Sequence, residues 1–319
     1  MPPTTSSLEQ RIIAALQVDG RAPWRRIAAV LGEAERTVAR YGTELLDSGA
    51  VTIVGLRTQP VSVVLRLSCQ PGTSRIAAEA LAQRPDSTFS YTMTGGADCV
   101  AELLFPENRM AEVLATEVPA ITGLRSTTAY PVLRYFRTVR GWRSGLLTEA
   151  QQQALRPSGS VDSLRPGEDS TLTAQDERII DALAEDGRAS MESLARRSGT
   201  SETTARHRAD WLLRNNRVQI RAVVDPRTMG LPIECFLWIR TSPSAVESVG
   251  RALARSTAVR YAAAIAGDYQ IVANVTLPDT TALYRFTTES PWAAEAHSVE
   301  PTILLQARKR SGLLLRPRV

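Results

Sequence analysis

The sequence predicts an α+β fold in which two winged helix-turn-helix domains alternate with two ferredoxin-like domains of βαββαβ order. The first observation is an internal repeat: residues 9–51 align with residues 176–218 at a constant offset of 167, with 16 identities in 43 positions. The second is that each aligned block has the periodicity of three short helices. The third is that each block is followed by strand-like segments that alternate with two more helices.

Composition narrows the class of protein. With 319 residues and 43% apolar composition, the chain can give several small domains a core each. Of its 38 basic residues only Lys309 is a lysine, and the abundant arginine gives weak support for a nucleic-acid partner. No apolar run could span a bilayer, and the N-terminus has no signal-peptide core, so we expect a cytoplasmic protein without membrane contact.

Cysteines and histidines are few and scattered. Cys69, Cys99 and Cys235 do not combine with His207 or His297 at the spacing that a metal site requires. We therefore expect no bound metal and no cofactor. The three cysteines are expected to be buried as small apolar side chains.

The first copy of the repeat begins with a winged helix-turn-helix. A capping box, Ser6-x-x-Glu9, predicts the start of its first helix, which ends at Asp19-Gly20. The second helix starts at Pro23, and the third spans about residues 35–47. A strand beginning at residues 51–54 completes the winged helix.

The second copy repeats this plan. Thr173-x-x-Asp176 caps its first helix and Ser190 its second. The third helix follows an N-cap at Ser201, and its apolar residues recur at helical spacing: Ala205, Ala209, Leu212 and Leu213. Its other face can contact base edges and phosphates through Thr203, Arg206, His207, Arg208 and Trp211. An ordinary amphipathic helix with a solvated basic face would carry the same residues. The choice between these two interpretations therefore depends on the rest of the chain.

After each block the alignment continues at an offset of 172, because copy two holds five extra residues around residues 224–230. The expected order is βαββαβ, which forms a four-stranded antiparallel sheet with both helices on one face. In copy one the elements are expected at residues 61–67, 73–82, 89–93, 99–105, 109–117 and 126–133, and in copy two at 233–241, 245–254, 259–266, 271–277, 280–289 and 298–305.

These patterns divide the chain into five segments. The segment between the copies is rich in helix breakers and predicts a linker, while the pentapeptide Arg-Ser-Gly-Leu-Leu that ends both sheet domains predicts an ordered segment. The segments are a first winged helix at 1–58, a first ferredoxin-like domain at 59–147, the linker at 148–171, a second winged helix at 172–225 and a second ferredoxin-like domain at 226–319.

One face of each sheet is too apolar to remain exposed to water. We expect the two sheets to pack face to face within the chain, as a pseudo-dimer, and the sequence leaves further homo-oligomers open. The faces expected to meet carry Val61, Val63 and Leu65 in copy one and Ile233, Cys235 and Leu237 in copy two.

A winged helix followed by a βαββαβ domain resembles the leucine-responsive regulatory protein/AsnC (Lrp/AsnC) family of bacterial transcription regulators. Four motifs of copy two carry the resemblance in the family order. They are the first helix at residues 176–189, the recognition helix at 201–208, the Asp225-Pro226-x-x-x-Gly230-Leu231 connection and the Gly267-Asp268-Tyr269 turn. The resemblance implies a DNA-binding transcriptional regulator whose sheet domain binds a small effector, commonly an amino acid.

The resemblance also implies where each ligand binds. Double-stranded DNA is expected at Ser201, Thr203, Thr204, Arg206, His207 and Arg208 in copy two, and at Arg36, Thr37 and Arg40 in copy one. The effector is expected at Gly267, Asp268, Tyr269 and Gln270, where a carboxylate beside backbone amides suits an amino acid. A glycine that only shapes the hairpin turn is the other explanation of Gly267.

Copy one departs from these patterns. It has Ala39 and Tyr41 in place of Arg206 and Arg208, and Gly42 lies inside its third helix at a cost of about 1 kcal/mol. Its turn reads Gly-Gly-Ala-Asp at residues 95–98, without the Asp-Tyr pair, which predicts one competent effector pocket per chain. The sequence leaves open whether copy one reads a second half-site or only completes the pair.

Two other functions compete with this interpretation. The same architecture occurs in the sirohaem decarboxylases, which join two such units and rely on histidine and arginine near the turn. The corresponding segments here, residues 84–105 and 255–277, contain no histidine, and no nucleophile elbow or phosphate loop is present, so we expect no enzymatic activity. An effector-sensing module without DNA binding is the other alternative, against which the basic face in copy two argues.

Overall fold

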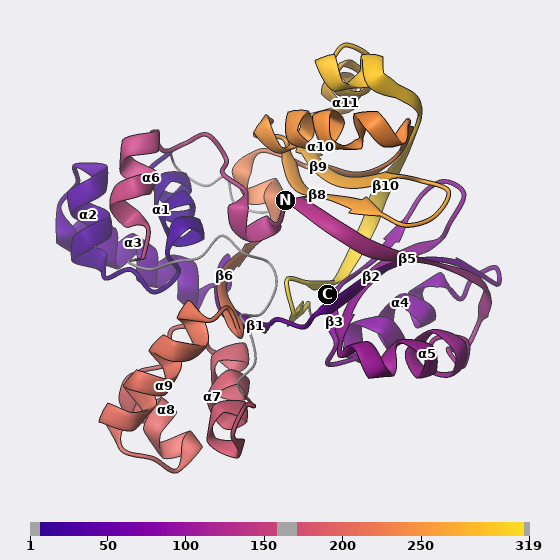
Figure 1. Ribbon diagram of the computed structural model, residues 1–319. Helices are drawn as coiled ribbons and strands as arrows, with labels where there is room; N and C mark the ends of the chain where they lie inside the picture. The colour runs from indigo at the N-terminus through magenta and orange to yellow at the C-terminus, as the bar shows by residue number, and fades with distance from the viewer. Residues whose placement is uncertain (1–6, 158–170, 316–319) are drawn as a thin grey trace. The chain divides into compact units, whose positions relative to one another are not determined.

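The computed structural model describes residues 7–157 and 171–315, and these form two compact units. Unit 1 contains residues 1–58 and 143–229, and unit 2 contains residues 59–142 and 230–319. Each unit therefore combines a part of copy one with the equivalent part of copy two (Figure 1). Unit 1 holds the helix-turn-helix elements of both copies, and unit 2 holds both sheets.

Unit 1 forms its helices where the capping residues predict them. Thr173, Ser190 and Ser201 each accept a hydrogen bond from a backbone amide in the first turn of their helix, whereas Ser6 lies outside the described residues. Copy one contributes α1 (Ser7–Val18), α2 (Trp24–Leu31), α3 (Glu35–Asp47) and β1 (Val51–Arg57), and copy two contributes α7 (Ala174–Glu185), α8 (Met191–Ser198), α9 (Glu202–Arg214), β6 (Val218–Val224) and the 3₁₀ turn η4 (Pro226–Met229).

The two helix-turn-helix regions share one two-stranded ribbon. Strands β1 and β6 pair with each other in an antiparallel ribbon that runs from Val51 opposite Val224 to Arg57 opposite Val218. The equivalent residues Val54 and Arg221 lie opposite each other, so a pseudo-twofold axis passes through the middle of the ribbon. The sequence predicts each strand as the wing of its own copy, and the pairing between the copies is a finding of the structure.

Two arginines lock the ribbon from both sides. The Arg21 guanidinium donates to the carbonyl oxygens of Gly187 (2.7 Å) and Ala189 (2.9 Å). Arg188 returns the contact to Gly20 at 2.7 Å and to Ala22 at 3.3 Å. The Asp-Gly-Arg-Ala block that both copies repeat is therefore an association motif between them.

Part of the predicted linker is an ordered helix. In α6 (Glu149–Leu155), Thr148 and Gln151 form a capping box, and Leu155 is fully buried. Arg26 of α2 donates to the Ala154 carbonyl at 2.8 Å, which fastens α6 to the first winged helix. Residues 149–155 of the segment expected as a linker are thus helical, and residues 158–170 of the same segment lie outside the described residues.

The glycine inside α3 has a packing reason. A Cβ atom at Gly42 would lie 2.4 Å from the Trp24 ring, so the glycine makes room for the indole. At the equivalent positions copy two has Met191 and Ala209. Methionine is smaller than tryptophan and has no ring, whereas alanine is larger than glycine. The Trp24 and Gly42 pair therefore replaces a differently shaped pair of similar total volume.

We expect Gly42→Ala alone to lower the free energy of unfolding by about 1 to 3 kcal/mol through overpacking. Adding Trp24→Met should restore most of that loss, because it reproduces the combination of copy two. Chemical denaturation of the two single variants and the double variant measures the coupling. Additive losses in the double variant would contradict this account.

Unit 2 contains two equivalent four-stranded sheets. Their strand orders are β3-β4-β2-β5 in copy one and β8-β9-β7-β10 in copy two. The strands are β2 (Val61–Cys69), β3 (Ser87–Met93), β4 (Cys99–Phe105), β5 (Leu124–Arg137), β7 (Ile233–Thr241), β8 (Val259–Ile265), β9 (Ile271–Leu277), β10 (Ala296–Arg310) and the short β11 (Leu313–Leu314). This is a mixed α/β arrangement, as the sequence predicts.

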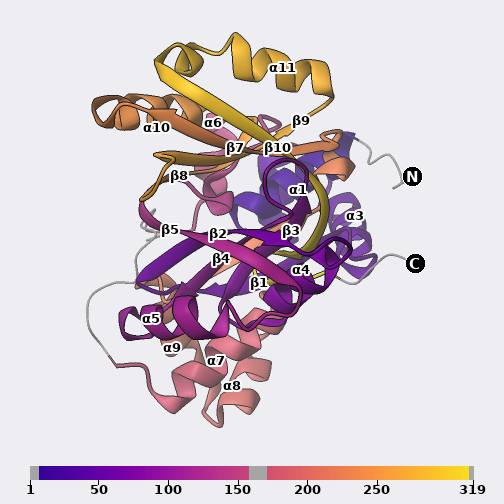
Figure 2. The ribbon, with the colours of Figure 1, turned by 90° about the vertical axis from the view of Figure 1, so that its right-hand side faces the viewer.

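The last strand of each copy joins both sheets. β5 pairs with β2 of its own copy and with β8 of the other, while β10 pairs with both β7 and β3. Eight strands therefore form a closed ring, which leaves none of them with an unpaired edge. Figure 2 shows the helices of unit 2 on opposite sides of the paired sheets, those of copy two on one side and those of copy one on the other.

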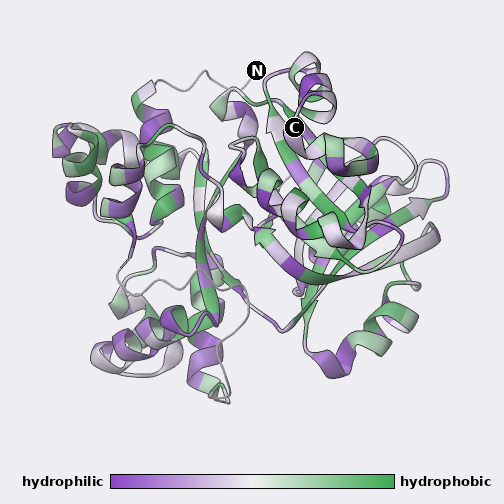
Figure 3. Ribbon diagram, turned by 45° about the horizontal axis from the view of Figure 1, so that its top comes forward, coloured by the Kyte–Doolittle hydropathy of each residue, from purple (hydrophilic) through white to green (hydrophobic). Residues whose placement is uncertain are grey.

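The outer helices are α4 (Ser74–Gln83), α10 (Val246–Arg255) and α11 (Thr280–Thr288). The helix expected at residues 109–117 is irregular and consists of η1 (Glu107–Arg109), α5 (Met110–Glu112) and the π-turn η2 (Val113–Glu117). The remaining 3₁₀ turns are η3 (Val139–Gly141), η5 (Pro243–Ala245) and η6 (Pro291–Glu295). In Figure 3 the helices alternate between hydrophilic and hydrophobic bands. None of the described helices combines the length and apolarity that crossing a bilayer requires.

The sheet faces that meet are the opposite ones from those expected. Val63 and Leu65 pack under the copy-one helices, and Cys235 and Leu237 pack under those of copy two. The neighbouring residues along the same strands, Val64, Phe236 and Trp238 among them, form the core between the sheets. Both faces of these strands are apolar, so alternation alone could not identify the face covered by helices. All three cysteines are buried, as expected.

Candidate functional site

Helix α9 presents a polar face to solvent because its apolar face is fixed. Ala205, Ala209 and Leu212 are buried against α7 and α8. The helical period therefore leaves four of the predicted DNA-contacting residues exposed, namely Thr203, Thr204, Arg206 and His207. The N-cap hydroxyl of Ser201, also exposed, bonds to the Thr204 backbone amide at 3.2 Å and to its hydroxyl at 2.9 Å.

Arg206 is the exposed cation of this face. It forms no hydrogen bond or ion pair with any other residue that the structure describes. Its guanidinium can therefore bind a phosphate or the two acceptors of a guanine without breaking an internal contact.

Arg208 is engaged inside the domain. Its Nε and Nη2 atoms donate to the two carboxylate oxygens of Asp176 at 2.7 and 2.5 Å, and its guanidinium stacks on Trp211 at 4.7 Å. Asp176 is fully buried and also accepts from Thr173. The capping box of α7 therefore takes up the charge of Arg208, and a contact between Arg208 and DNA stays a prediction.

The equivalent face of α3 is chemically different. Arg36 is exposed and forms no hydrogen bond or ion pair with the described residues, whereas Arg40 pairs with Glu44 at 3.0 Å and stacks on Tyr41. Thr37 is half-buried. In α3 the exposed arginine without an internal partner is therefore Arg36, in the first turn of the helix. In α9 it is Arg206, about one turn farther along.

In unit 2, the Gly267–Gln270 turn is built against copy one. Gly267 has φ of +143°, and a Cβ atom there would lie 2.7 Å from the Tyr130 ring of β5. The residue must therefore be glycine both for its backbone angle and for this close approach. The hairpin-turn explanation of Gly267 accounts for the angle but not for the tyrosine that packs on it.

Asp268 forms an exposed polar cluster at this turn. Its Oδ1 accepts from the Tyr130 hydroxyl at 2.8 Å, and its Oδ2 accepts from Arg240 Nη2 at 3.2 Å. Partial burial disfavours the charged form of Asp268, but the hydrogen bonds from Tyr130 and Arg240 outweigh it and lower the pKa of this carboxyl. The side chains of Arg240 and Asp268 are 47% and 57% exposed, so a ligand can reach both.

Tyr269 connects the turn to the buried side of the sheet. It is buried, its hydroxyl donates to Glu300, and Arg66 forms two hydrogen bonds with the same carboxylate at 3.1 and 2.6 Å. The Arg66 guanidinium also lies 4.6 Å from the centre of the Trp238 ring. Burial disfavours the charged form of Glu300, but Arg66 and Tyr269 outweigh it and lower the pKa of Glu300. The Arg240 guanidinium lies 4.5 Å from the centre of the Tyr269 ring.

Sequence reasoning missed four members of this cluster: Tyr130, Arg66, Arg240 and Glu300. Tyr130 and Arg66 come from copy one, whereas the turn belongs to copy two. One signal was present, because the aligned partner of Arg66 is Trp238, a cation opposite an aromatic ring at equivalent positions.

The equivalent turn of copy one lacks these groups. Gly96, Ala97 and Ser68 stand at the positions of Asp268, Tyr269 and Arg240. Asp98 closes the turn by accepting from the Cys69 amide at 2.7 Å, as Gln270 does from the Thr241 amide at 3.1 Å. Gln270 is therefore a structural part of its turn.

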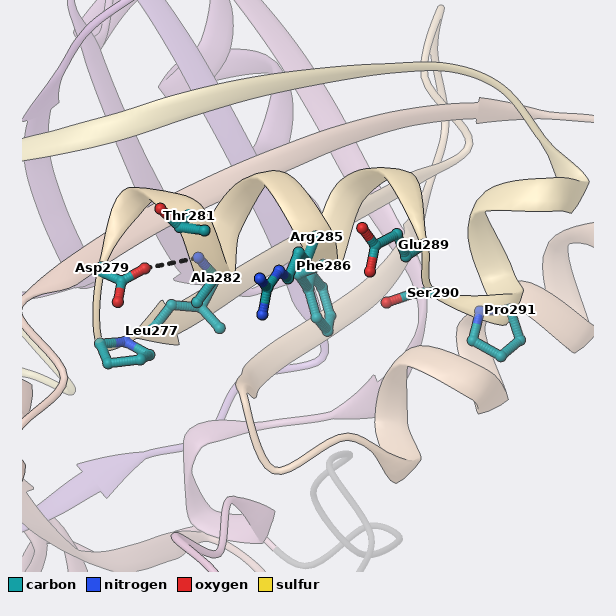
Figure 4. Close-up of a pocket in the computed structure, with 10 residues that line it drawn as sticks. Leu277, Asp279, Thr281, Ala282, Arg285, Phe286, Glu289, Ser290 and Pro291 are labelled. Carbon is teal, nitrogen blue, oxygen red and sulfur yellow. Dashed lines mark hydrogen bonds between the residues drawn. The ribbon is translucent and has the colours of Figure 1, made fainter.

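A separate hollow of about 610 Å³ lies beside α11 (Figure 4). Asp279 caps this helix by accepting from the Ala282 amide at 2.7 Å, and the walls include Arg285, Phe286 and Glu289. None of the residues expected to bind an effector lines it. Among the described residues no group of three or more His, Cys, Asp and Glu side chains could hold a metal ion.

Parts of both units match domain families that are described for transcriptional regulators. The AsnC-type helix-turn-helix domain matches twice, at residues 7–40 and 172–212, and the Lrp/AsnC ligand binding domain matches residues 234–314. An uncharacterized HTH-type transcriptional regulator of Pyrococcus abyssi is 31% identical over 136 residues, which are 42% of this chain and 86% of the relative. One of Pyrococcus horikoshii is 29% identical over 136 residues, with the same shares covered.

Similarity over most of the length is found to a solved enzyme structure. The siroheme decarboxylase NirDL superposes with a TM-score of 0.59 and 14% identity, and the match covers 95% of this chain and 92% of the decarboxylase. At that identity the likeness concerns the fold alone.

Proposed function

The chain belongs to the Lrp/AsnC family of helix-turn-helix transcriptional regulators, and from that premise we propose that it binds specific duplex DNA through α9 under the control of a small zwitterionic effector. The observation that carries the DNA part is the exposed, uncommitted Arg206 on a recognition helix whose apolar face is buried. Thr203, Thr204 and His207 surround it and supply further hydrogen-bonding groups. Arg208 supports this face by holding α9 against α7.

We expect Arg206→Ala to weaken specific DNA binding by about 1 to 3 kcal/mol and to reduce its salt dependence by the share of one cationic contact. Fluorescence anisotropy on selected operator fragments, repeated at several salt concentrations, measures both effects. Arg75→Ala is the matched control, because Arg75 is an exposed arginine on α4 of unit 2 and its removal changes the net charge equally. Equal losses in the two variants would show that the effect is one of net charge.

The effector part rests on the cluster around Asp268. Arg240 and Asp268 form an exposed ion pair, and such pairs contribute only about 0 to 1 kcal/mol, so a ligand can part them at little cost. An amino acid would place its ammonium group on Asp268 and its carboxylate on Arg240, with its side chain near Tyr269. The partners that hold the turn, Tyr130 and Glu300, come from two different strands, so occupancy would bias how the copies pack.

We expect calorimetry with the best ligand from an amino-acid screen to give one site per chain. Asp268→Asn and Arg240→Gln should each abolish binding, because each removes one of the two charges that hold the zwitterion. Ser68→Ala is the matched control at the copy-one position equivalent to Arg240. Two equal sites per chain, or binding that survives both substitutions, would place the pocket elsewhere.

The shared fold with the siroheme decarboxylase supports a second candidate, a tetrapyrrole-binding function. In this chain the space between the sheets is filled with aromatic side chains, among them Phe89, Phe236 and Trp238. We therefore expect no spectral shift when siroheme is titrated into the protein. A stoichiometric shift would favour the enzyme over the regulator.

A further inference from the structure

The structure holds two different recognition helices in one unit. Of the polar positions that face solvent at least in part, α3 and α9 share only two aligned pairs, Glu35 with Glu202 and Thr37 with Thr204. At other positions the aligned residues differ: Arg36 aligns with Thr203, Ala39 with Arg206, and Arg40 with His207. A symmetric dimer cannot carry such a difference, because its two helices have one sequence.

The committed and uncommitted charges sharpen the difference. On α3, Arg36 in the first turn forms no ion pair with the described residues, and Arg40 forms an exposed ion pair with Glu44 and stacks on Tyr41. On α9, Arg206 is available about one turn farther along, and the first-turn position is a threonine. Because the N-terminal residues of a recognition helix contact base edges, the two cations address different base pairs within their half-sites.

The relation between the helices is fixed. Seven residue pairs join β1 to β6, and Arg21 and Arg188 each bond to the backbone of the other copy. Arg57 of the ribbon adds an ion pair to Glu177 of α7. The two helices therefore belong to one body, in which one spacing and one relative orientation of half-sites fit.

We propose that this chain recognises an asymmetric DNA site, composed of two unlike half-sites in one orientation and at one spacing, with Arg36 reading one half and Arg206 the other. The inference rests on the proposed DNA-binding function. It assigns copy one a reading role of its own, and it makes the operator directional, so that a bound chain has a defined upstream and downstream side.

Selection of bound duplexes from a random library tests the inference with the full chain. The expected consensus is non-palindromic. Arg206→Ala should lose about 5- to 150-fold in affinity and relax the sequence preference in one half only, and Arg36→Ala should do the same in the other half. Inserting half a helical turn, about 5 base pairs, between the halves should abolish the joint site.

A graft gives the sharpest outcome. The triple variant Arg36→Thr, Ala39→Arg and Arg40→His gives α3 the equivalents of Thr203, Arg206 and His207 of α9, and its selected consensus should become an inverted repeat of the Arg206 half. A palindromic consensus for the natural chain, or an Arg36→Ala variant with the natural preference in both halves, overturns the inference while leaving DNA binding intact. Failure to select any duplex would instead contradict the proposed function.

Discussion

Replacing Arg208 with alanine is expected to lower the free energy of unfolding of unit 1 by about 3 to 5 kcal/mol, because the change strands a buried carboxylate. Asp176 has no exposed surface, and Arg208 bonds to both of its oxygens. The Thr173 backbone and hydroxyl donate to one of those oxygens, so the carboxyl group also caps α7. Thermal and chemical denaturation measure the loss.

Two controls separate stability from DNA contact. Arg206→Ala removes an arginine from the same helix and is expected to leave the free energy of unfolding within about 0.5 kcal/mol of the natural value. The double variant Asp176→Leu and Arg208→Met is expected to be more stable than Arg208→Ala, because it removes both charges. An Arg208→Ala protein of unchanged stability that binds DNA poorly would return Arg208 to the set of DNA-contacting residues.

The same pair predicts a pH dependence. Burial disfavours the charged form of Asp176, but the hydrogen bonds from Arg208 and Thr173 outweigh it, so the folded-state pKa lies below the usual value of about 3.9. The stabilisation is therefore complete above the pKa of the unfolded state and is lost as the pH falls through the lowered folded-state pKa. Arg208→Ala should abolish this part of the acid dependence of stability.

Replacing Glu102 with alanine is expected to destabilise unit 2 by on the order of 4 kcal/mol or more, because four hydroxyl groups lose one common acceptor. The Glu102 side chain is buried between the sheets, and its carboxylate accepts from Ser62, Tyr135 and Tyr261 at 2.9 Å each and also from Thr88. Tyr261 belongs to copy two, so the carboxylate also joins the copies. The equivalent residue of copy two is Asn274, so only copy one supplies a carboxylate at this position.

Graded variants test the network. Tyr135→Phe and Tyr261→Phe each remove one hydrogen bond and should cost about 1 to 2 kcal/mol in unfolding free energy. Tyr284→Phe, at a tyrosine that is 66% exposed, is the matched control and should cost nothing measurable. A Glu102→Ala protein as stable as the natural chain would refute the role of this carboxylate.

Local signals predicted most of the elements. The caps at Thr173, Ser190 and Ser201 act where the sequence placed them, and α3 has the predicted bounds. What the sequence could not supply is the pairing of elements that are far apart in the chain. The ribbon of β1 and β6, and the choice of sheet face, depend on which surface finds a partner, and alternation along a strand does not encode that choice.

The candidate sites show the same division. Helical spacing correctly separated the exposed Arg206 from the buried Ala205, but it could not show that Arg208 would meet a carboxylate 32 residues earlier. Around Asp268, the motif supplied the turn, whereas Tyr130 and Arg66 arrive from copy one. When residues of both copies form one site, that site cannot be predicted from the sequence of either copy taken separately.

The closed ring of strands cannot be completed until the end of synthesis on the ribosome, because β10 is the last of its strands to be made. Lys309 of β10 donates to the Arg84 carbonyl, made 225 residues earlier, and β10 is the strand that completes the edge at β3. At about 5 to 20 residues per second, the nascent first half waits some 10 to 45 s for that strand. During this interval the aromatic face around Phe89 and Tyr91 is uncovered and the edge of β3 is open. The newly made half therefore exposes apolar surface and an open strand edge, the two features that favour aggregation, until translation reaches the C-terminal strand.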